Sequence, residues 1–408
     1  MAHSKIGFHV GSGGNHNGIG DWLRRVNGDR VPVGLKSVDH YGRLEEALQI
    51  GRDNGVDNWL VYRMTRGNLS REVPNYTTNP QDDAVALCEE AIGKLPPTFD
   101  KAVWLELVNE VRGKLSDDDQ MFNNMRACDY MGEWCLAAAK YLNARGYKFA
   151  GPAFNSGEPG KDRDLASAVA YYSEPGMLNY LRYCAANPTM AALAVHEYVW
   201  DRWLQGETVA DWYPNFWGRF EAAIAAADLH GIPRTFPIFV TEFGFGFEIA
   251  PDLEKARPML DARNRMLARF PQVKFDAAWA LQEYGQNSSE VSNNVNSWMG
   301  YYQTGQTFAE GSQPARTDAV FGGTLPGDGN LPPPSPPPDT FSEGDTLYVA
   351  STGLNLREGP SVEHTIITAL SQGTAVTILE PGGWARVQAN GHTGFVASRY
   401  LSATQPGA

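Results

Sequence analysis

Short apolar runs rich in β-branched and aromatic residues alternate with longer segments of helical periodicity over residues 1–322. We expect strands at residues 5–10, 31–38, 58–64, 102–108, 147–153, 191–198, 236–242 and 275–281. Between the runs, apolar residues recur at helical spacing, most clearly over residues 39–55, 82–95, 215–231 and 252–270. Strands that alternate with helices pair in parallel, and eight such units predict a closed (β/α)8 TIM barrel.

A doubly wound open sheet is the structural alternative for the same alternation. Such a sheet binds nucleotides at an ordered glycine-rich loop after its first strand. The segment after the first run, GSGGNHNG at residues 11–18, is rich in glycine but matches no nucleotide fingerprint. The pattern therefore favours the barrel.

Prolines cluster in GDGNLPPPSPPPDT, residues 327–340. Clustered prolines favour extended polyproline II and cannot join a helix interior or a central strand, so residues 323–341 are interpreted as a stiff linker. Beyond it, short β-rich runs broken by glycine and proline predict a small all-β barrel over residues 342–408. The expected organisation is a catalytic barrel at residues 1–322, the linker and this small domain.

The composition is that of a globular protein with many aromatic residues, namely 11 Trp, 17 Tyr and 18 Phe. Aromatic side chains stack on sugars and on bases, but the net charge of −13 lacks the basic footprint of a nucleic-acid partner. Four cysteines show neither metal-ligand spacing nor the density of a disulfide scaffold. Trp200 and Trp203 in YVWDRW fit a sugar platform and a barrel cap equally well.

The N-terminal segment MAHSKIGFHVGSGG has no basic stretch followed by an apolar region, so no signal peptide is readable in it. The sequence also contains no run of apolar residues long enough for a transmembrane helix, and we expect no membrane span. An extracellular location would then depend on a removed signal or on another export route.

A glutamate stands at the end of one predicted strand and just beyond the end of another. VWLELVNEVRG (103–113) leads into Asn109 and Glu110, and FPIFVTEFGFG (236–246) leads into Glu242. Each glutamate alone is more often a surface or ion-paired residue. Because the catalytic residues of such barrels stand where strands end, the two together supply the proton donor and the nucleophile or base of glycosidic bond cleavage. Glu106 faces the same way as Glu110 and is expected to be a buried partner.

The motifs around these glutamates resemble those of clan A glycoside hydrolases, closest to families 5 and 39. ELVNEV (106–111) and PIFVTEFG (237–244) resemble the strand-four and strand-seven signatures. AGPAFN (150–155), VHEY (195–198) and the tryptophan of AAWAL (277–281) are similar to the motifs of strands five, six and eight.

The resemblance implies a retaining enzyme that cleaves β-linked oligo- or polysaccharides by double displacement, without a metal or an organic cofactor. It makes Glu110 the acid/base and Glu242 the nucleophile, and a retaining enzyme holds these carboxyl groups about 5–5.5 Å apart. The residues it assigns to substrate binding are Asn109, His196, Tyr198 and Trp279.

The C-terminal region resembles a bacterial SH3 domain through LNLREGPS (354–361), GGWARV (382–387) and GFVASRYL (394–401). Such domains commonly bind cell-wall peptide or glycan, which implies association with a wall or polymer outside the cell. Two other interpretations stay open. The SH3-like region alone suggests a peptidoglycan-cleaving lysin, and a barrel that has lost activity would make a glycan-binding surface protein.

Overall fold

The computed structural model describes two compact units, Met1–Val320 and Phe321–Ala408. The described residues are 2–111, 122, 125–160, 165–200, 202–207, 209–246, 248–282, 288–301, 307–308, 342–349, 353–359, 364–381, 384–398, 401–403 and 405. The predicted linker, residues 323–341, lies outside them.

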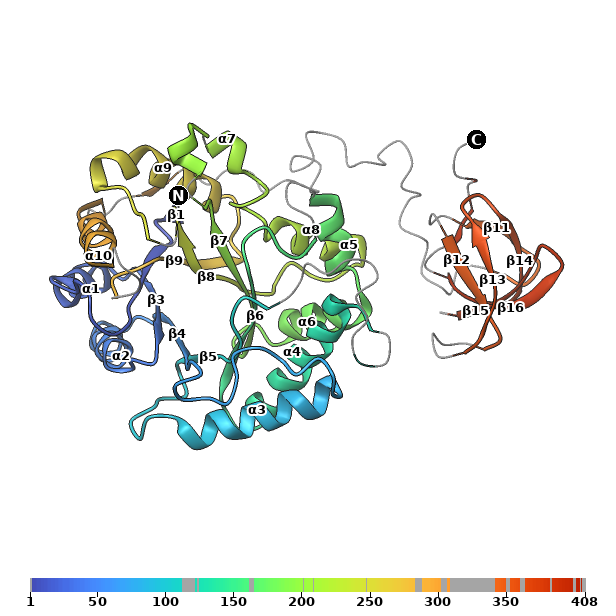
Figure 1. Ribbon diagram of the computed structural model, residues 1–408, viewed down its shortest axis with the longest axis horizontal. Helices are drawn as coiled ribbons and strands as arrows, with labels where there is room; N and C mark the ends of the chain where they lie inside the picture. Colours follow the sequence, from blue (N-terminus) through green and yellow to red (C-terminus); the bar gives the residue numbers. More distant parts are fainter. Residues whose placement is uncertain are drawn as a thin grey trace. The chain divides into compact units, whose positions relative to one another are not determined.

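The first unit is a closed barrel of parallel strands with helices around it (Figure 1). Round the barrel the strands are β2 (Ile6–His9), β3 (Gly34–Val38), β4 (Trp59–Arg63), β5 (Trp104–Glu106), β6 (Lys148–Phe154), β7 (Ala191–Tyr198), β8 (Ile238–Gly244) and β9 (Val273–Ala278). β9 pairs with β2 and closes the ring. All eight overlap the predicted runs, which confirms the (β/α)8 fold. Outside the ring, β1 (Ala2–His3) pairs antiparallel with β10 (Thr307–Phe308).

The helices of this unit are α1 (Ile19–Gly28), α2 (Gly42–Asn54), α3 (Pro80–Lys94), α4 (Ala127–Asn143), α5 (Leu165–Tyr172), α6 (Pro175–Ala186), α7 (Val209–Trp212), α8 (Glu221–Leu229), α9 (Leu253–Leu267) and α10 (Ser288–Ser297). Two 3-10 turns, η2 (Arg202–Gln205) and η3 (Trp298–Tyr301), complete the described elements. None of the helices in the described part of the chain has both the length and the apolar character needed to cross a membrane.

Helix ends follow local chemistry. The Asn79 side chain accepts hydrogen bonds from the Gln81 and Asp82 amides and so begins α3, with Pro80 in the first turn. The helix predicted over residues 215–231 starts only at Glu221, because Gly218 has a φ of 88°, which no right-handed helix accommodates.

The barrel interior is filled by large rings set against small residues. Trp104, Phe239 and Phe275 pack with alanines contributed by β6, β7 and β9. At Gly34 a Cβ atom would lie 2.2 Å from the Phe275 side chain, so only glycine fits beside this ring. The strands are buried on both faces, which is why they read as apolar runs rather than as alternating patterns. The four cysteines are buried free thiols.

Strand β8 carries one extra residue near its C-terminal end. Val195 of β7 is in register with Val240, whereas the next residue, His196, is in register with Glu242, so Thr241 forms a bulge. A bulge re-aims the side chain that follows it. Phe239 and Glu242 therefore both point into the barrel, although they stand three residues apart.

The second unit is a sheet of seven antiparallel strands, which confirms the predicted all-β domain. In sheet order the strands are β13 (Ile366–Ser371), β12 (Gly353–Arg357), β16 (His392–Ala397), β15 (Trp384–Ala389), β14 (Ala375–Glu380), β11 (Thr346–Val349) and β17 (Leu401–Ser402). Buried aliphatic residues from these strands, among them Leu356, Val376 and Val387, form its core.

Several buried carboxyl groups of the barrel lie outside the cavity described below, and Glu221 is one of them. Glu221, the first residue of α8, is fully buried and accepts a 2.6 Å hydrogen bond from the Tyr213 hydroxyl. Burial raises the pKa of Glu221 to about 8. The folded protein therefore keeps a proton on this carboxyl group over a pH range in which the unfolded chain has released it.

We expect the stability of the barrel to fall with rising pH because of Glu221. The stabilisation is complete below the unfolded pKa near 4.5 and is lost as the pH rises through about 8, a loss on the order of 5 kcal/mol. Glu221→Gln should remove this contribution to the pH dependence. The free energy of unfolding of the variant should therefore rise relative to that of wild type between pH 5 and 8, as measured by denaturant unfolding followed by tryptophan fluorescence. Glu254→Gln, an exposed first-turn glutamate of α9, is the control. Parallel profiles for wild type and Glu221→Gln would contradict the prediction.

Candidate active site

A cavity of about 530 Å³ opens at the C-terminal ends of the barrel strands. Five of the six residues predicted for the site line it, namely Asn109, Glu110, Tyr198, Glu242 and Trp279. His196 lies beneath them and is almost fully buried. The remaining lining residues are Ser12, Val38, Asp39, Arg63, Thr65, Arg66, Glu72, Trp200 and Gln282.

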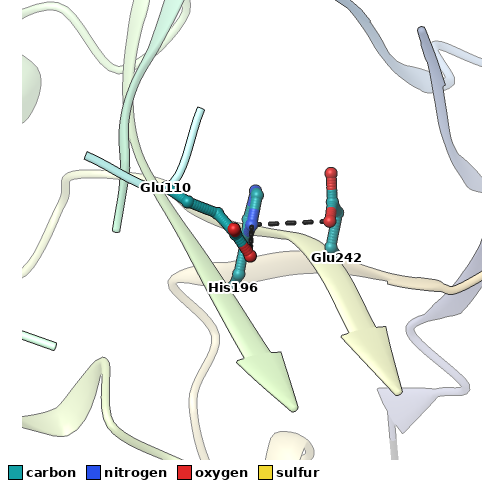
Figure 2. Close-up of side chains that lie close together, drawn as sticks. All are labelled: Glu110, His196 and Glu242. Carbon is teal, nitrogen blue, oxygen red and sulfur yellow. Dashed lines mark ion pairs between the residues drawn. The ribbon is translucent and has the colours of Figure 1, made fainter. Parts of the chain in front are cut away.

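The two predicted catalytic glutamates lie on either side of His196, as Figure 2 shows. His196 Nδ1 is 3.8 Å from Glu110 Oε1 and 3.5 Å from Glu242 Oε2. One atom from each of the three side chains lies within 4.8 Å of the other two, so the carboxylates face each other across a short gap.

The two carboxylates have unequal surroundings. The Glu110 side chain is 34% exposed and that of Glu242 only 5%. Glu110 has a left-handed backbone with a φ of 45°, and the bridge from the next residue, Val111, to Phe154 of β6 anchors this loop. Glu110 therefore stands at the cavity wall, whereas Glu242 lies at its floor.

Glu242 is held as an anion at the floor of the cavity. Lys36 Nζ donates to Glu242 Oε1 at 2.7 Å, and the Tyr198 hydroxyl donates to Oε2 at 2.7 Å. Burial alone would raise the pKa of Glu242, but the basic side chains around it, first His196 and then Lys36, His9 and Arg63, outweigh burial and hold the pKa well below its usual range.

The groups around Glu242 differ in the charge they carry. Burial raises the pKa of Tyr198 well above its usual value, and the Glu242 charge adds to this, so the phenol stays protonated and donates. Burial lowers the pKa of His9 well below its usual value, and Lys36 and Arg63 lower it further, so this imidazole is neutral at pH 7. The His9 ring packs on Trp279 at 4.6 Å between centroids.

Sequence reasoning missed three side chains at the cavity floor: His9 of β2, Lys36 of β3 and Arg63 of β4. A lysine inside the apolar run VPVGLKSV was the available signal, because a lysine is rarely buried without a partner. Glu106 fulfils its prediction as a buried partner, since it accepts a 2.6 Å bond from Lys36 Nζ.

Glu110, His196 and Glu242 are residue types that also bind metal ions. The Lys36 ammonium lies 2.7 Å from Glu242 and the Arg63 guanidinium 3.6 Å from it. A divalent cation placed among the three side chains would meet both positive charges. The electrostatics therefore favour a carboxylate pair bridged by a histidine.

The cavity wall offers both polar and aromatic contacts. The Asn109 side-chain oxygen is buried with no hydrogen-bond partner in the described part of the chain, so it is available to a ligand hydroxyl. Trp200 is 39% exposed and lines the cavity, whereas Trp203 packs edge-on against Phe245. Of the two tryptophans, Trp200 therefore has the position of a platform.

Comparison with known proteins identifies the second unit. Residues 352–402 match the family described as bacterial SH3 domain, as predicted. "Probable endopeptidase p60" of Listeria innocua is 42% identical over 57 residues, which is 13% of this chain and 12% of that protein. A Bacillus subtilis protein named as an N-acetylmuramoyl-L-alanine amidase is 46% identical over 57 residues, 14% of this chain and 11% of that protein. The chain thus spans only a small part of these relatives.

Solved structures similar to this chain include a GH5-4 broad specificity endoglucanase from Clostridium acetobutylicum. It is 11% identical with a TM-score of 0.39, over 71% of this chain and 93% of that one. The GH5-4 endoglucanase from Ruminococcus champanellensis with bound cellotriose is 12% identical with a TM-score of 0.39, over 68% and 81%. These values are low, and we therefore base the functional proposal on the residues of the site.

The hydrogen bond from Tyr198 should contribute to the low pKa of Glu242. In Tyr198→Phe the carboxylate loses a donor that favours its charged form, so we expect the pKa of Glu242 to rise. A ¹³C NMR titration of labelled glutamate carboxyl groups, assigned by loss of one signal in Glu242→Gln, measures the shift. Tyr141→Phe removes a 2.9 Å tyrosine–glutamate bond elsewhere and serves as the control. Equal midpoints in Tyr198→Phe and wild type would refute the expected role of this hydroxyl.

Proposed function

We propose that this protein is a retaining glycoside hydrolase that cleaves β-linked glycans by double displacement, with Glu110 as acid/base and Glu242 as nucleophile. The observation that carries the proposal is the pair of facing carboxylates at the barrel mouth. Their closest oxygens lie within 4.8 Å, which fits the separation of about 5–5.5 Å in retaining enzymes and leaves too little room for the water of an inverting one.

The unequal surroundings suit two different tasks. In the first step a Glu242 oxygen bonds to the anomeric carbon, the glycosidic C–O bond breaks, and Glu110 gives its proton to the departing oxygen. In the second step Glu110 takes a proton from water, the water oxygen bonds to the anomeric carbon, and Glu242 leaves as a carboxylate. A nucleophile must be ionised at the start, and the low pKa of Glu242 meets this requirement.

The same cavity can hold a sugar ring in place. Trp279 and Tyr198 provide aromatic surface in the cavity wall, and the unpartnered Asn109 oxygen can accept a hydrogen bond from a sugar hydroxyl. Trp200 extends the aromatic surface toward solvent, where a second sugar would stack. No residue of this set needs a metal or an organic cofactor for the steps above.

For the second unit we propose binding to a cell wall or another insoluble polymer, and hence an extracellular or wall-associated location. The proposal rests on the bacterial SH3 match and on the names of the relatives, an endopeptidase and an amidase. These names also favour a second candidate for the whole chain, cleavage of peptidoglycan. A glycan-binding protein without activity is the remaining alternative.

The experiment is hydrolysis of a panel of β-glucans, mannans, xylans and purified cell walls, with the product anomer followed by NMR. Retained configuration is expected. Glu242→Gln should abolish turnover of every substrate, because no other group can form the glycosyl ester. Glu110→Gln should lose about 10²–10⁴-fold on polymers but keep the first step on aryl glycosides, whose leaving groups need no proton.

Glu254→Gln is the matched control for these two variants, since it removes an exposed carboxylate of α9. Inverted products would contradict the retaining mechanism. Equal losses in both variants on aryl glycosides, with no intermediate accumulating, would mean that the two roles are misassigned. Release of wall fragments alone would favour the peptidoglycan candidate, and no turnover of any substrate would favour the binding protein.

Removal of the second unit should separate targeting from chemistry. A module that binds an insoluble polymer raises the local concentration of the barrel without changing its site. Truncation near residue 325 should therefore leave activity on soluble oligosaccharides unchanged and reduce activity and retention on the insoluble polymer. A pull-down of residues 342–408 with walls and polysaccharides measures binding directly. Full activity of the truncated chain on insoluble substrate, together with no pull-down, would refute a targeting role.

A further inference from the structure

The ammonium of Lys36 is fully buried at the centre of the site. Its Nζ lies 2.6 Å from Glu106 Oε1, 2.7 Å from Glu242 Oε1 and 3.5 Å from His196 Nε2. An ammonium group has three donors, and each faces one of these partners. Lys36 thus connects β3 with β5, β7 and β8.

We propose that Lys36 is a positioning residue of this site: its ammonium keeps the Glu242 carboxylate ionised at the floor of the cavity and orients His196 so that Nδ1–H faces both Glu110 and Glu242. The catalytic consequence rests on the double displacement proposed above. The effect of Lys36 on the ionisation of Glu242 and on the orientation of His196 rests on the geometry alone.

The charge count supports this role. The groups that face Glu242 are His9 from β2, Lys36 from β3, Arg63 from β4, Glu106 and Glu110 from β5 and the loop after it, and His196 and Tyr198 from β7. At the floor, two cations, Lys36 and Arg63, balance two anions, Glu106 and Glu242. Without Lys36 the floor would hold one excess negative charge, and Glu106 would repel Glu242.

Lys36 rather than Arg63 is the closer cation. Arg63 stands 3.6 Å from both Glu242 and Glu106, and its 3.3 Å contact is with Glu72 at the cavity wall. Lys36 makes contacts of 2.6 and 2.7 Å with both floor carboxylates and has no exposed surface. Of these two cations, Lys36 therefore attracts the Glu242 carboxylate more strongly.

The same ammonium fixes the histidine tautomer. Lys36 Nζ is only a donor, so the facing His196 Nε2 is the acceptor and the ring proton is on Nδ1. Nδ1 is the atom that lies 3.5–3.8 Å from the two carboxylates. In the glycosyl intermediate Glu242 is an uncharged ester, which leaves the floor with one excess positive charge. That charge favours Glu110 as a carboxylate, the form needed to take a proton from water.

The test measures the ionisation of Glu242 in the full-length protein by ¹³C NMR titration of its carboxyl signal. Lys36→Met should raise the titration midpoint, and Lys36→Met combined with Glu106→Gln should return it toward wild type because the floor is again balanced. Lys274→Met removes a lysine at the opposite end of the barrel wall, on β9, and should have no effect. The ¹⁵N signals of His196 should show Nδ1–H in wild type and a mixture in Lys36→Met.

Activity provides a second readout. In Lys36→Met the acidic limb of the pH profile of kcat/KM should move to higher pH together with the titration midpoint of Glu242. On that limb kcat/KM should fall about tenfold for each pH unit of the shift. The double variant should return the limb toward its wild-type position. If Lys36→Met does not fold, the comparison of Glu106→Gln with the double variant isolates the same lysine.

An unmoved Glu242 midpoint, or a loss of activity that is uniform across pH and not recovered in the double variant, would overturn the assignment. The NMR titration needs no turnover. An inactive wild type with a shifted midpoint would therefore reject the glycosidase proposal and keep the role of Lys36 in ionising Glu242.

Discussion

The arrangement of this site depends on one buried ammonium shared by two carboxylates. Removing the charges of Lys36, Glu106 and Glu242 from water is costly, and close pairing offsets the cost only when the geometry is tight. Each of these residues is on a different strand, so the barrel must hold three strands in fixed register at its C-terminal end. Two large rings below, Trp104 and Phe239, fill the interior and exclude water from beneath the charges.

The eight strands could be predicted because strands buried on both faces are apolar throughout. The two glutamates of the proposed site could also be found, since Glu242 ends one such run and Glu110 follows another by two residues. The orientation of Glu242 was not, because it depends on the bulge at Thr241. Strict alternation from Phe239 would place Glu242 outside the barrel. The carboxylate partners of Lys36 could not be predicted for another reason. Ion pairs between strands depend on three-dimensional register, and no local pattern in a single sequence shows which carboxylates a buried lysine contacts.

The cavity above the charged floor has two chemically different walls. Tyr198, Trp200 and Trp279 form an aromatic wall at the ends of β7 and β9, while Asp39 and Arg66 lie on the polar side, in loops after β3 and β4. An aromatic face binds the apolar face of a sugar ring, and polar groups read its hydroxyls. The division places aromatic surface on one side of the two carboxylates and polar groups on the other.

The second unit has its own source of stability. Its core is built from residues between Leu347 and Leu401, and in the described part of the chain its sheet pairs within residues 346–402. A domain that folds on its own residues can bind a polymer without disturbing the charge balance on which Glu242 depends. The binding energy of such a domain cannot lower the chemical barrier, because only interactions that strengthen in the transition state do so. If the second unit binds a polymer as proposed, its contribution would be to concentrate the barrel at a surface, and the choice of bond would stay with the cavity walls of the barrel.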